Sequence, residues 1–158
     1  MGLAFALLGA ALAVGLPCAA AGIGISWVQS VSAKVVMADP DKFAKTLVLQ
    51  LIPTSSGLYG FVVGFMVLLN TVMSDAANLS IMSGLILFAA CLPVALTVGG
   101  VTLYQSKVCE AGVKMVARND ELSGRALTMS VITELFNLFG FIISILSVMM
   151  LTSGDMLN

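Results

Sequence analysis

The feature that most constrains the fold of this chain is its division into four long apolar runs by three short polar breaks. An α-helix needs about 20 residues to cross the hydrocarbon core of a membrane, and every run is longer than that. A backbone in lipid must satisfy its own hydrogen bonds, which favours helices for runs of this length. We therefore predict an all-α membrane protein with four transmembrane helices, at Met1–Ala38, Thr46–Ser74, Leu79–Ser106 and Ala126–Thr152.

The composition supports this class and excludes others. Hydrophobic residues make up 59% of the chain and charged residues 9%, whereas soluble domains carry about 25% charged residues. A net charge of −1 without clustered Lys or Arg argues against nucleic-acid binding. The first run lacks a basic start and continues past the length of a signal-peptide core, so we expect it to be a spanning helix.

The cysteines do not form a pattern typical of a disulfide framework or a metal site. Cys18, Cys91 and Cys109 lie in or beside apolar runs, in an odd number and without paired spacing. We expect them to be small packing residues. Histidine is absent, which removes imidazole as a ligand, a base or a proton relay.

The basic residues predict how the helices are oriented in the lipid bilayer. All of them lie in or beside the first or the third break, namely Lys34, Lys42, Lys45, Lys107, Lys114, Arg118 and Arg125. The positive-inside rule then places the loops between helices 1–2 and 3–4 in the cytoplasm. Both termini and the loop that contains Asp75 would lie on the opposite side of the cell membrane.

One charged face predicts that the third helix continues past the membrane. Lys107, Glu110, Lys114 and Arg118 fall on one side of a helix that begins in the third run. This face is either a solvated surface with ion pairs along the helix or a docking surface for a partner.

The chain contains an internal repeat of a helical hairpin. Gly15–Ser30 matches Cys91–Ser106 at a shift of 76 residues, and Leu47–Phe61 matches Leu127–Phe141 at a shift of 80 residues. The second half therefore has four extra residues, about one helical turn, near its cytoplasmic loop. Because each repeat contains two helices, the duplication is parallel rather than the inverted repeat of many transporters.

The two hairpins, residues 1–75 and 76–158, differ at the position of greatest chemical importance, where Glu134 aligns with Thr54. Only the second hairpin therefore carries an acid in the membrane. Small residues are concentrated in the first helix and, less strongly, in the third. Because small residues allow helices to approach closely, these two helices suit the crowded inner wall of a ring.

Glu134 is the strongest candidate for a functional residue. No other residue from Ala126 to Gly154 carries a charge. A charged side chain at the centre of a bilayer costs about 2.5–3.5 kcal/mol on insertion scales, so such residues are functional candidates by default. The alternative is a permanently protonated residue that only makes structural hydrogen bonds.

The second helix offers oxygen atoms that could meet this acid. The segment "IPTSSGLY" places Ile52, Ser55, Ser56 and Tyr59 on one helix face. Pro53 has no backbone N–H to donate and distorts the helix, which leaves carbonyl oxygens available. Carbonyl, hydroxyl and carboxylate oxygens are the ligands preferred by hard cations, and Na⁺ is such a cation.

The third and fourth helices offer further polar groups. Gln105 can add an amide oxygen, while Ser130 and Asn137 flank the acid at i−4 and i+3 and could form a second shell. Gln29 is the repeat partner of Gln105 and is expected to make a packing hydrogen bond, and the role of Gln50 is open. A carboxyl group that is either protonated or ion-loaded is neutral in lipid, which describes a carrier.

The chain resembles the proteolipid (K or c) subunit of prokaryotic V-type ATPases over nearly its whole length. The resemblance rests on the duplicated hairpin together with "IPTSSGLYGF", "LYQSKVCEAGV" and "ITELFNLFGF". It implies a homo-oligomeric rotor ring in the membrane, which turns against a stator subunit. A central stalk, docked at loops Ala38–Lys42 or Arg118–Glu121, would couple rotation to ATP hydrolysis or synthesis in partner subunits.

The resemblance implies that the chain is not itself an enzyme and has no cofactor beyond the transported Na⁺ or H⁺. In agreement, the sequence contains no GxxxxGK[ST] nucleotide-binding loop. Two other classes are compatible with a membrane acid. One is a small four-helix proton-coupled exporter, although such proteins lack a parallel repeat, and the other is a purely structural four-helix membrane protein.

The resemblance also implies roles for individual residues. The essential carboxylate of the family matches Glu134. Sodium-binding members carry a helix-2 motif of the form Leu-Pro-Gly-Thr-Gln-Gly-Leu-Tyr-Gly and a helix-3 Gln. By position, this implies a Na⁺ site formed by Glu134, the Ile52 carbonyl, the Ser55 hydroxyl, the Ser56 side chain and the Gln105 amide, with Tyr59 locking the carboxylate.

This sequence departs from that motif at three positions. Ser55 replaces Thr and keeps a hydroxyl, Thr54 replaces Gly, and Ser56 replaces Gln and so loses the longer reach of an amide. A water or the Ser56 hydroxyl could fill the gap. Retention of Ser55, Gln105 and Tyr59 favours Na⁺ over H⁺.

Overall fold

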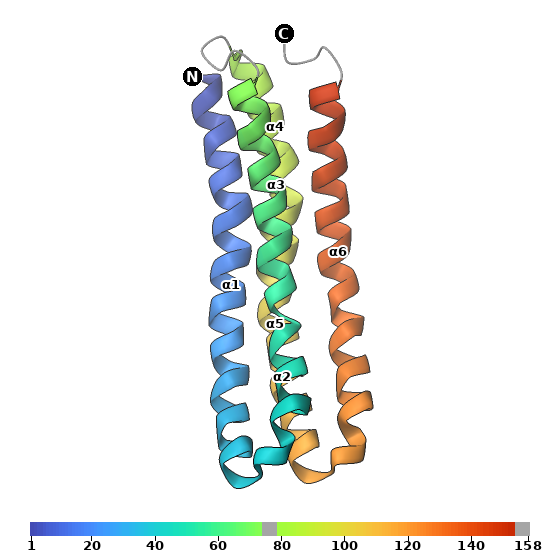
Figure 1. Ribbon diagram of the computed structural model, residues 1–158. Helices are drawn as coiled ribbons and strands as arrows, with labels where there is room; N and C mark the ends of the chain where they lie inside the picture. The colour runs from blue at the N-terminus through green and yellow to red at the C-terminus, as the bar shows by residue number, and fades with distance from the viewer. Residues whose placement is uncertain (74–78, 154–158) are drawn as a thin grey trace.

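The computed structural model describes residues 1–73 and 79–153 and arranges them as a bundle of long, roughly parallel helices (Figure 1). Four stretches are long and apolar enough to span a membrane, and no strand occurs in the described part of the chain. The predicted all-α fold is thereby confirmed. The helices are α1 (Gly2–Ala38), α2 (Phe43–Leu51), α3 (Thr54–Met73), α4 (Ile81–Pro93), α5 (Gly99–Arg118) and α6 (Ser123–Ser153).

Proline affects the second and third spans differently. The second span is interrupted at Ile52 and Pro53, between α2 and α3, because proline cannot donate the backbone hydrogen bond that a continuous helix requires. The third span stays continuous through a π-helical segment, Val94–Val98, that follows Pro93. There the Val94 N–H donates to Ser144 Oγ of α6 at 2.9 Å.

The turns that join the helices of each hairpin have the same local structure. The first contains the 3₁₀ helix Pro40–Lys42 and the second the 3₁₀ helix Asp120–Leu122. The Asp39 carboxylate accepts the Asp41 N–H at 3.2 Å, and the Asn119 side-chain oxygen accepts the Glu121 N–H at 2.9 Å. Such Asx turns begin helices by satisfying an otherwise unpaired backbone N–H.

These matching turns locate the four extra residues of the second hairpin. Asp39 and Asn119 occupy equivalent positions at a shift of 80, whereas Ser30 and Ser106 correspond at a shift of 76. The four extra residues therefore lie in the C-terminal part of α5, between Ser106 and Asn119.

Both turns lie at the same end of the bundle, opposite the start of α1 (Figure 1). Polar contacts join them: Lys42 Nζ donates to the Ala117 carbonyl at 2.8 Å, and Lys45 pairs with Asp120 at 2.8 Å. Nearby, Lys107 and Lys114 pair with Glu110 along α5. As predicted, α5 continues with its charged face to Arg118.

Two apolar clusters form the core, and α1 packs against α3, α4 and α5 throughout. The loop-end cluster contains Val28, Leu49, Cys109, Val113, Val116 and Ala126. The far-end cluster contains Ala6, Ala10, Ala13, Val63, Val67, Leu79, Leu87, Ala90, Cys91, Val94, Val98 and Val148. The predicted packing role of cysteine holds for Cys91 and Cys109, and all three cysteines are unpaired.

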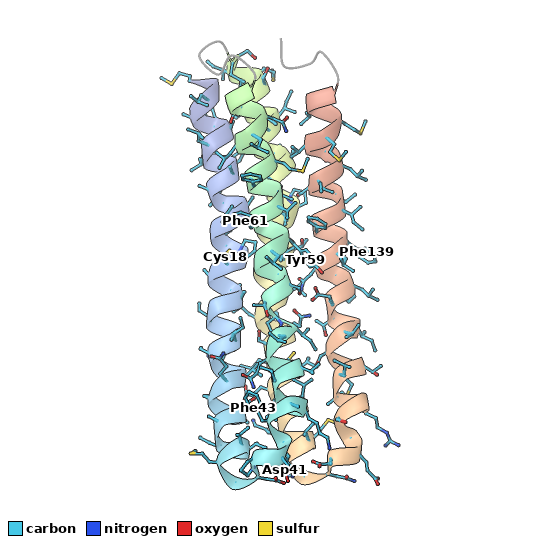
Figure 2. All side chains as sticks on the ribbon, viewed as in Figure 1. Cys18, Asp41, Phe43, Tyr59, Phe61 and Phe139 are labelled. Atoms are coloured by element: carbon cyan, nitrogen blue, oxygen red, sulfur yellow. The ribbon has the colours of Figure 1, made fainter. Side chains whose placement is uncertain are left out.

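The outward faces of α3 and α6 are strongly apolar. Phe61 of α3 and Phe139 of α6 project away from the bundle (Figure 2) and are 52% and 60% exposed. Large exposed apolar faces are expected for helices that contact lipid or neighbouring subunits.

Gly60 of α3 tests the close packing of the first hairpin. A Cβ atom at Gly60 would overlap the Ala13 carbonyl oxygen and approach Pro17 Cγ to 2.8 Å. We expect Gly60→Ala to lower the free energy of unfolding in detergent by about 1–3 kcal/mol, because α1 and α3 must separate. Gly124→Ala is the matched control, since a Cβ there meets no atom within 4 Å. Equal stability of the two variants would contradict this packing.

Candidate ion-binding site

A polar site lies between the two apolar clusters, where α3, α5 and α6 meet. The helices contribute Ser55 and Ser56 (α3), Gln105 (α5), and Glu134 and Asn137 (α6). Ser56, Gln105 and Asn137 are fully buried, whereas Glu134 is half-buried. The spans that contain these helices contribute buried residues to the apolar clusters on both sides of the site, which holds the polar side chains at one level.

Both oxygen atoms of the Glu134 carboxyl group accept hydrogen bonds. The Ser55 hydroxyl donates to Oε1 at 2.6 Å. The Gln105 amide donates to Oε2, and Asn137 Nδ2 lies 3.3 Å from the same oxygen. Donors from three helices therefore compensate much of the cost of removing this acid from water.

Tyr59 lies on the side of α3 that faces α6 (Figure 2). Its phenol group interacts with both Glu134 and Ser55. Its ring stacks on Phe141 of α6 with 4.9 Å between ring centroids. The stacked aromatic ring thus positions the Tyr59 hydroxyl near the carboxyl group.

The other two predicted ligands are placed differently. The Ile52 carbonyl oxygen accepts the Ser55 backbone N–H at 3.3 Å and lies 2.7 Å from Ser55 Oγ, whose single hydrogen can be donated either to this carbonyl or to Glu134. Ser56 Oγ is linked to the acid through Asn137, whose Nδ2 lies 3.1 Å away. The break at Pro53 therefore exposes a carbonyl, but Ser55 is its partner in this arrangement.

Asn137 lies beside the proposed ligands. The sequence pattern suggests a second-shell position, and the amide contacts Ser56, Gln105 and Glu134. Its position one turn after Glu134 is the available signal, because residues at i and i+3 share a helix face.

Three further candidates lie outside the site. The Ser130 hydroxyl donates to the Ala126 carbonyl at 3.0 Å, within its own helix. Gln29 has an exposed side chain and Gln50 a half-buried one. At the repeat-related position of the acid, Thr54 donates its hydroxyl to the Leu51 carbonyl.

The chemistry of the assembled groups suits a small cation or a proton. One carboxyl group, two serine hydroxyls, two amides and a phenol converge, and oxygen ligands are those that hard cations prefer. Within the described residues, no group of three or more His, Cys, Asp or Glu side chains could hold a metal ion. A single carboxylate balances one positive charge, which fits a monovalent cation.

Comparison with known proteins identifies the family. The chain matches the family of ATP synthase C subunits twice, over residues 8–67 and 88–147. It is 31% identical over 148 residues to the V-type sodium ATPase subunit K of Enterococcus hirae, covering 94% of this chain and 92% of that protein. It is 34% identical over 149 residues to the A-type ATP synthase subunit K of Methanocaldococcus jannaschii, covering 93% and 63% respectively.

The two family matches fall one in each predicted hairpin, which is consistent with the duplication. They argue against both an exporter and a purely structural protein. The chain belongs to the family of ATP synthase C subunits, the non-catalytic, ion-translocating proteolipids that form the rotor ring of rotary ATPases.

Proposed function

We propose that this rotor protein transports Na⁺ in preference to H⁺, with Glu134 as the carrier residue. The observation that supports the proposal is the set of donors around Glu134, which come from three different helices. A proton needs only a carboxylate and one hydrogen-bond partner. Two buried amides and two hydroxyls exceed that need but resemble the oxygen-rich shell of a hard cation.

The proposed ligands are the Glu134 carboxylate, the hydroxyls of Ser55 and Ser56, the Gln105 amide oxygen and the Ile52 carbonyl. An amide presents either its nitrogen or its oxygen after a half-turn of the side chain, so Gln105 can donate to the carboxylate or bind a cation. The relative from Enterococcus hirae is named as a sodium ATPase subunit, which favours the same ion here.

Charge neutralisation explains how this site would work in a rotating ring. When Glu134 holds Na⁺ or a proton it is neutral and can face lipid at little cost. Without either it is charged, and a charge at the bilayer centre is expensive. Release is therefore confined to places where the stator provides an aqueous path, and each charge moved across 100 mV involves about 2.3 kcal/mol.

The two hairpins would have separate roles. We infer that the hairpin of residues 76–158 carries the ion and that the hairpin of residues 1–75 completes the ring wall. The boundary between them falls in residues 74–78, outside the described residues. Because Thr54 stands where an acid would be needed, each set of four helices holds one ion.

The charged end of the bundle is the proposed cytoplasmic side. The basic residues cluster around the turns Pro40–Lys42 and Asp120–Leu122, as the positive-inside rule requires. Lys42 and Lys45 contact the second hairpin there, so the two loops form one joined surface. This surface, between Ala38–Lys42 and Arg118–Glu121, is where the central stalk would dock.

Labelling by a hydrophobic carbodiimide tests the ion. We expect the reagent to modify Glu134 in the purified ring, and Na⁺ at constant pH to slow the reaction, because a bound cation shields the carboxyl group. The measurement is the labelling rate, by mass spectrometry, against Na⁺ concentration at several pH values. If pH alone alters the rate, H⁺ is the transported ion instead.

Removal of the charge tests the carrier role. Glu134→Gln keeps the size and hydrogen-bonding capacity of the side chain, so the ring is expected to assemble with its normal mass in mild detergent. Coupled ion transport by the complete ATPase in vesicles should be abolished. Transport at the parent rate would refute the carrier role of Glu134.

Removal of one hydroxyl tests the lock. Tyr59→Phe keeps the stack on Phe141 but removes the phenol oxygen beside Glu134. We expect carbodiimide labelling to become roughly tenfold faster or more, as loss of a hydrogen bond to a charged group costs about 1.5–3 kcal/mol. Phe141→Leu is the comparison, because it weakens the stack and leaves the hydroxyl. No change of rate in Tyr59→Phe would argue against the lock.

A further inference from the structure

We propose that Asn137 is a direct ligand of the transported cation and helps to determine which ion the site accepts. The inference rests on the proposed function of Glu134 as a sodium carrier and extends it to a residue outside the ligand set inferred from the sequence.

The Asn137 side chain lies at the centre of the polar site. It is fully buried. Its Nδ2 atom is 3.1 Å from Ser56 Oγ, 3.1 Å from Gln105 Oε1 and 3.3 Å from Glu134 Oε2. The side chain therefore connects α3, α5 and the carboxyl group of α6.

The hydrogen bonding of this amide is unbalanced. Nδ2 carries two hydrogens but lies near three acceptors. Oδ1 is buried without a hydrogen-bond partner among the described residues, although buried polar atoms are normally paired. An amide with excess acceptors at its nitrogen and no partner at its oxygen would form better hydrogen bonds in another orientation.

Rotation of the Asn137 amide group by half a turn would exchange the positions of Oδ1 and Nδ2. Oδ1 would then face Glu134 Oε2 and Gln105 Oε1, and the Ser56 hydroxyl could donate to it. Oxygens that face one another repel unless a positive charge lies among them. A cation held by these oxygens would remove the repulsion and satisfy the buried Oδ1 atom.

The internal repeat argues against a merely structural role for this amide. Asn137 corresponds to Gly57 at the same shift of 80 that pairs Glu134 with Thr54. The acid and the amide are thus present together in one hairpin and absent together from the other. A Cβ at Gly57 would only reach ordinary contact with Cys18 Sγ, at 3.7 Å, so a hairpin can pack without an amide here.

Asn137 also accounts for the short side chain at position 56. The Ser56 hydroxyl reaches the carboxyl group only through Asn137. The amide that Ser56 cannot supply from α3 is therefore supplied from α6. This exchange predicts that a longer amide at position 56 can replace the one at position 137.

The test measures the Na⁺ concentration that halves carbodiimide labelling of Glu134 in assembled rings at constant pH. Asn137→Ala is expected to raise this concentration about tenfold to a hundredfold, as loss of a partner of a charged group implies. Asn137→Leu, which keeps the volume without the amide, should do the same. The double variant Ser56→Gln/Asn137→Ala should return toward the parent value.

Ser144→Ala is the control. Ser144 is also a fully buried polar residue of α6, but its Oγ accepts the Val94 N–H outside the site, so its removal should leave the half-protecting concentration unchanged. An equal rise in Ser144→Ala would show general loosening of α6 and overturn the proposal.

The outcomes separate this inference from the proposed function. If Na⁺ protects the parent and protects Asn137→Ala and Asn137→Leu equally well, Asn137 is not a ligand although the sodium carrier stands. If Na⁺ fails to protect the parent, the sodium proposal and this inference both fall. If the alanine variant does not assemble, the leucine and double variants decide the question by the same measurement.

Discussion

The structure depends on keeping one carboxyl group satisfied inside an apolar bundle. Glu134 is acceptable at its depth because donors on α3 and α5, together with Asn137 of α6, reach both of its oxygens. That requirement determines which faces of the helices must meet. The apolar clusters on either side hold the helices at that meeting point, so packing and polar chemistry specify the same arrangement.

Much of this arrangement is predictable from the sequence. Run length predicts four spans because lipid leaves the backbone no partner but itself. Helical periodicity places Ser55 and Tyr59 on one face, and both interact with Glu134 in the structure. The repeat predicts two similar hairpins, and the matching Asx turns at Asp39 and Asn119 show that the similarity extends to the loops.

Other features depend on distances that periodicity does not provide. The i+3 spacing places Asn137 beside Glu134 on α6, but only the packing of α3 and α5 against α6 brings its amide to Ser56 and Gln105. Pro53 and Pro93 have the same intrinsic chemistry, yet one separates two helices and the other is followed by a π-helical segment. Beside Pro93 the Val94 N–H donates to Ser144 of α6, a contact between residues far apart in the chain.

The four extra residues of α5 act as a spacer that brings the site into register. Measured from the matching turns, Gln105 lies one helical turn farther along its helix than Gln29, a rise of about 6 Å. Glu134 and Thr54, by contrast, lie equally far from their turns. The insertion thus raises Gln105 to the level of the acid. If Thr54 were replaced by an acid, Gln29 would still lie one helical turn closer to the loop than Gln105 does in the second hairpin. The first hairpin therefore differs from the ion-carrying hairpin in the length of its first helix as well as in charge.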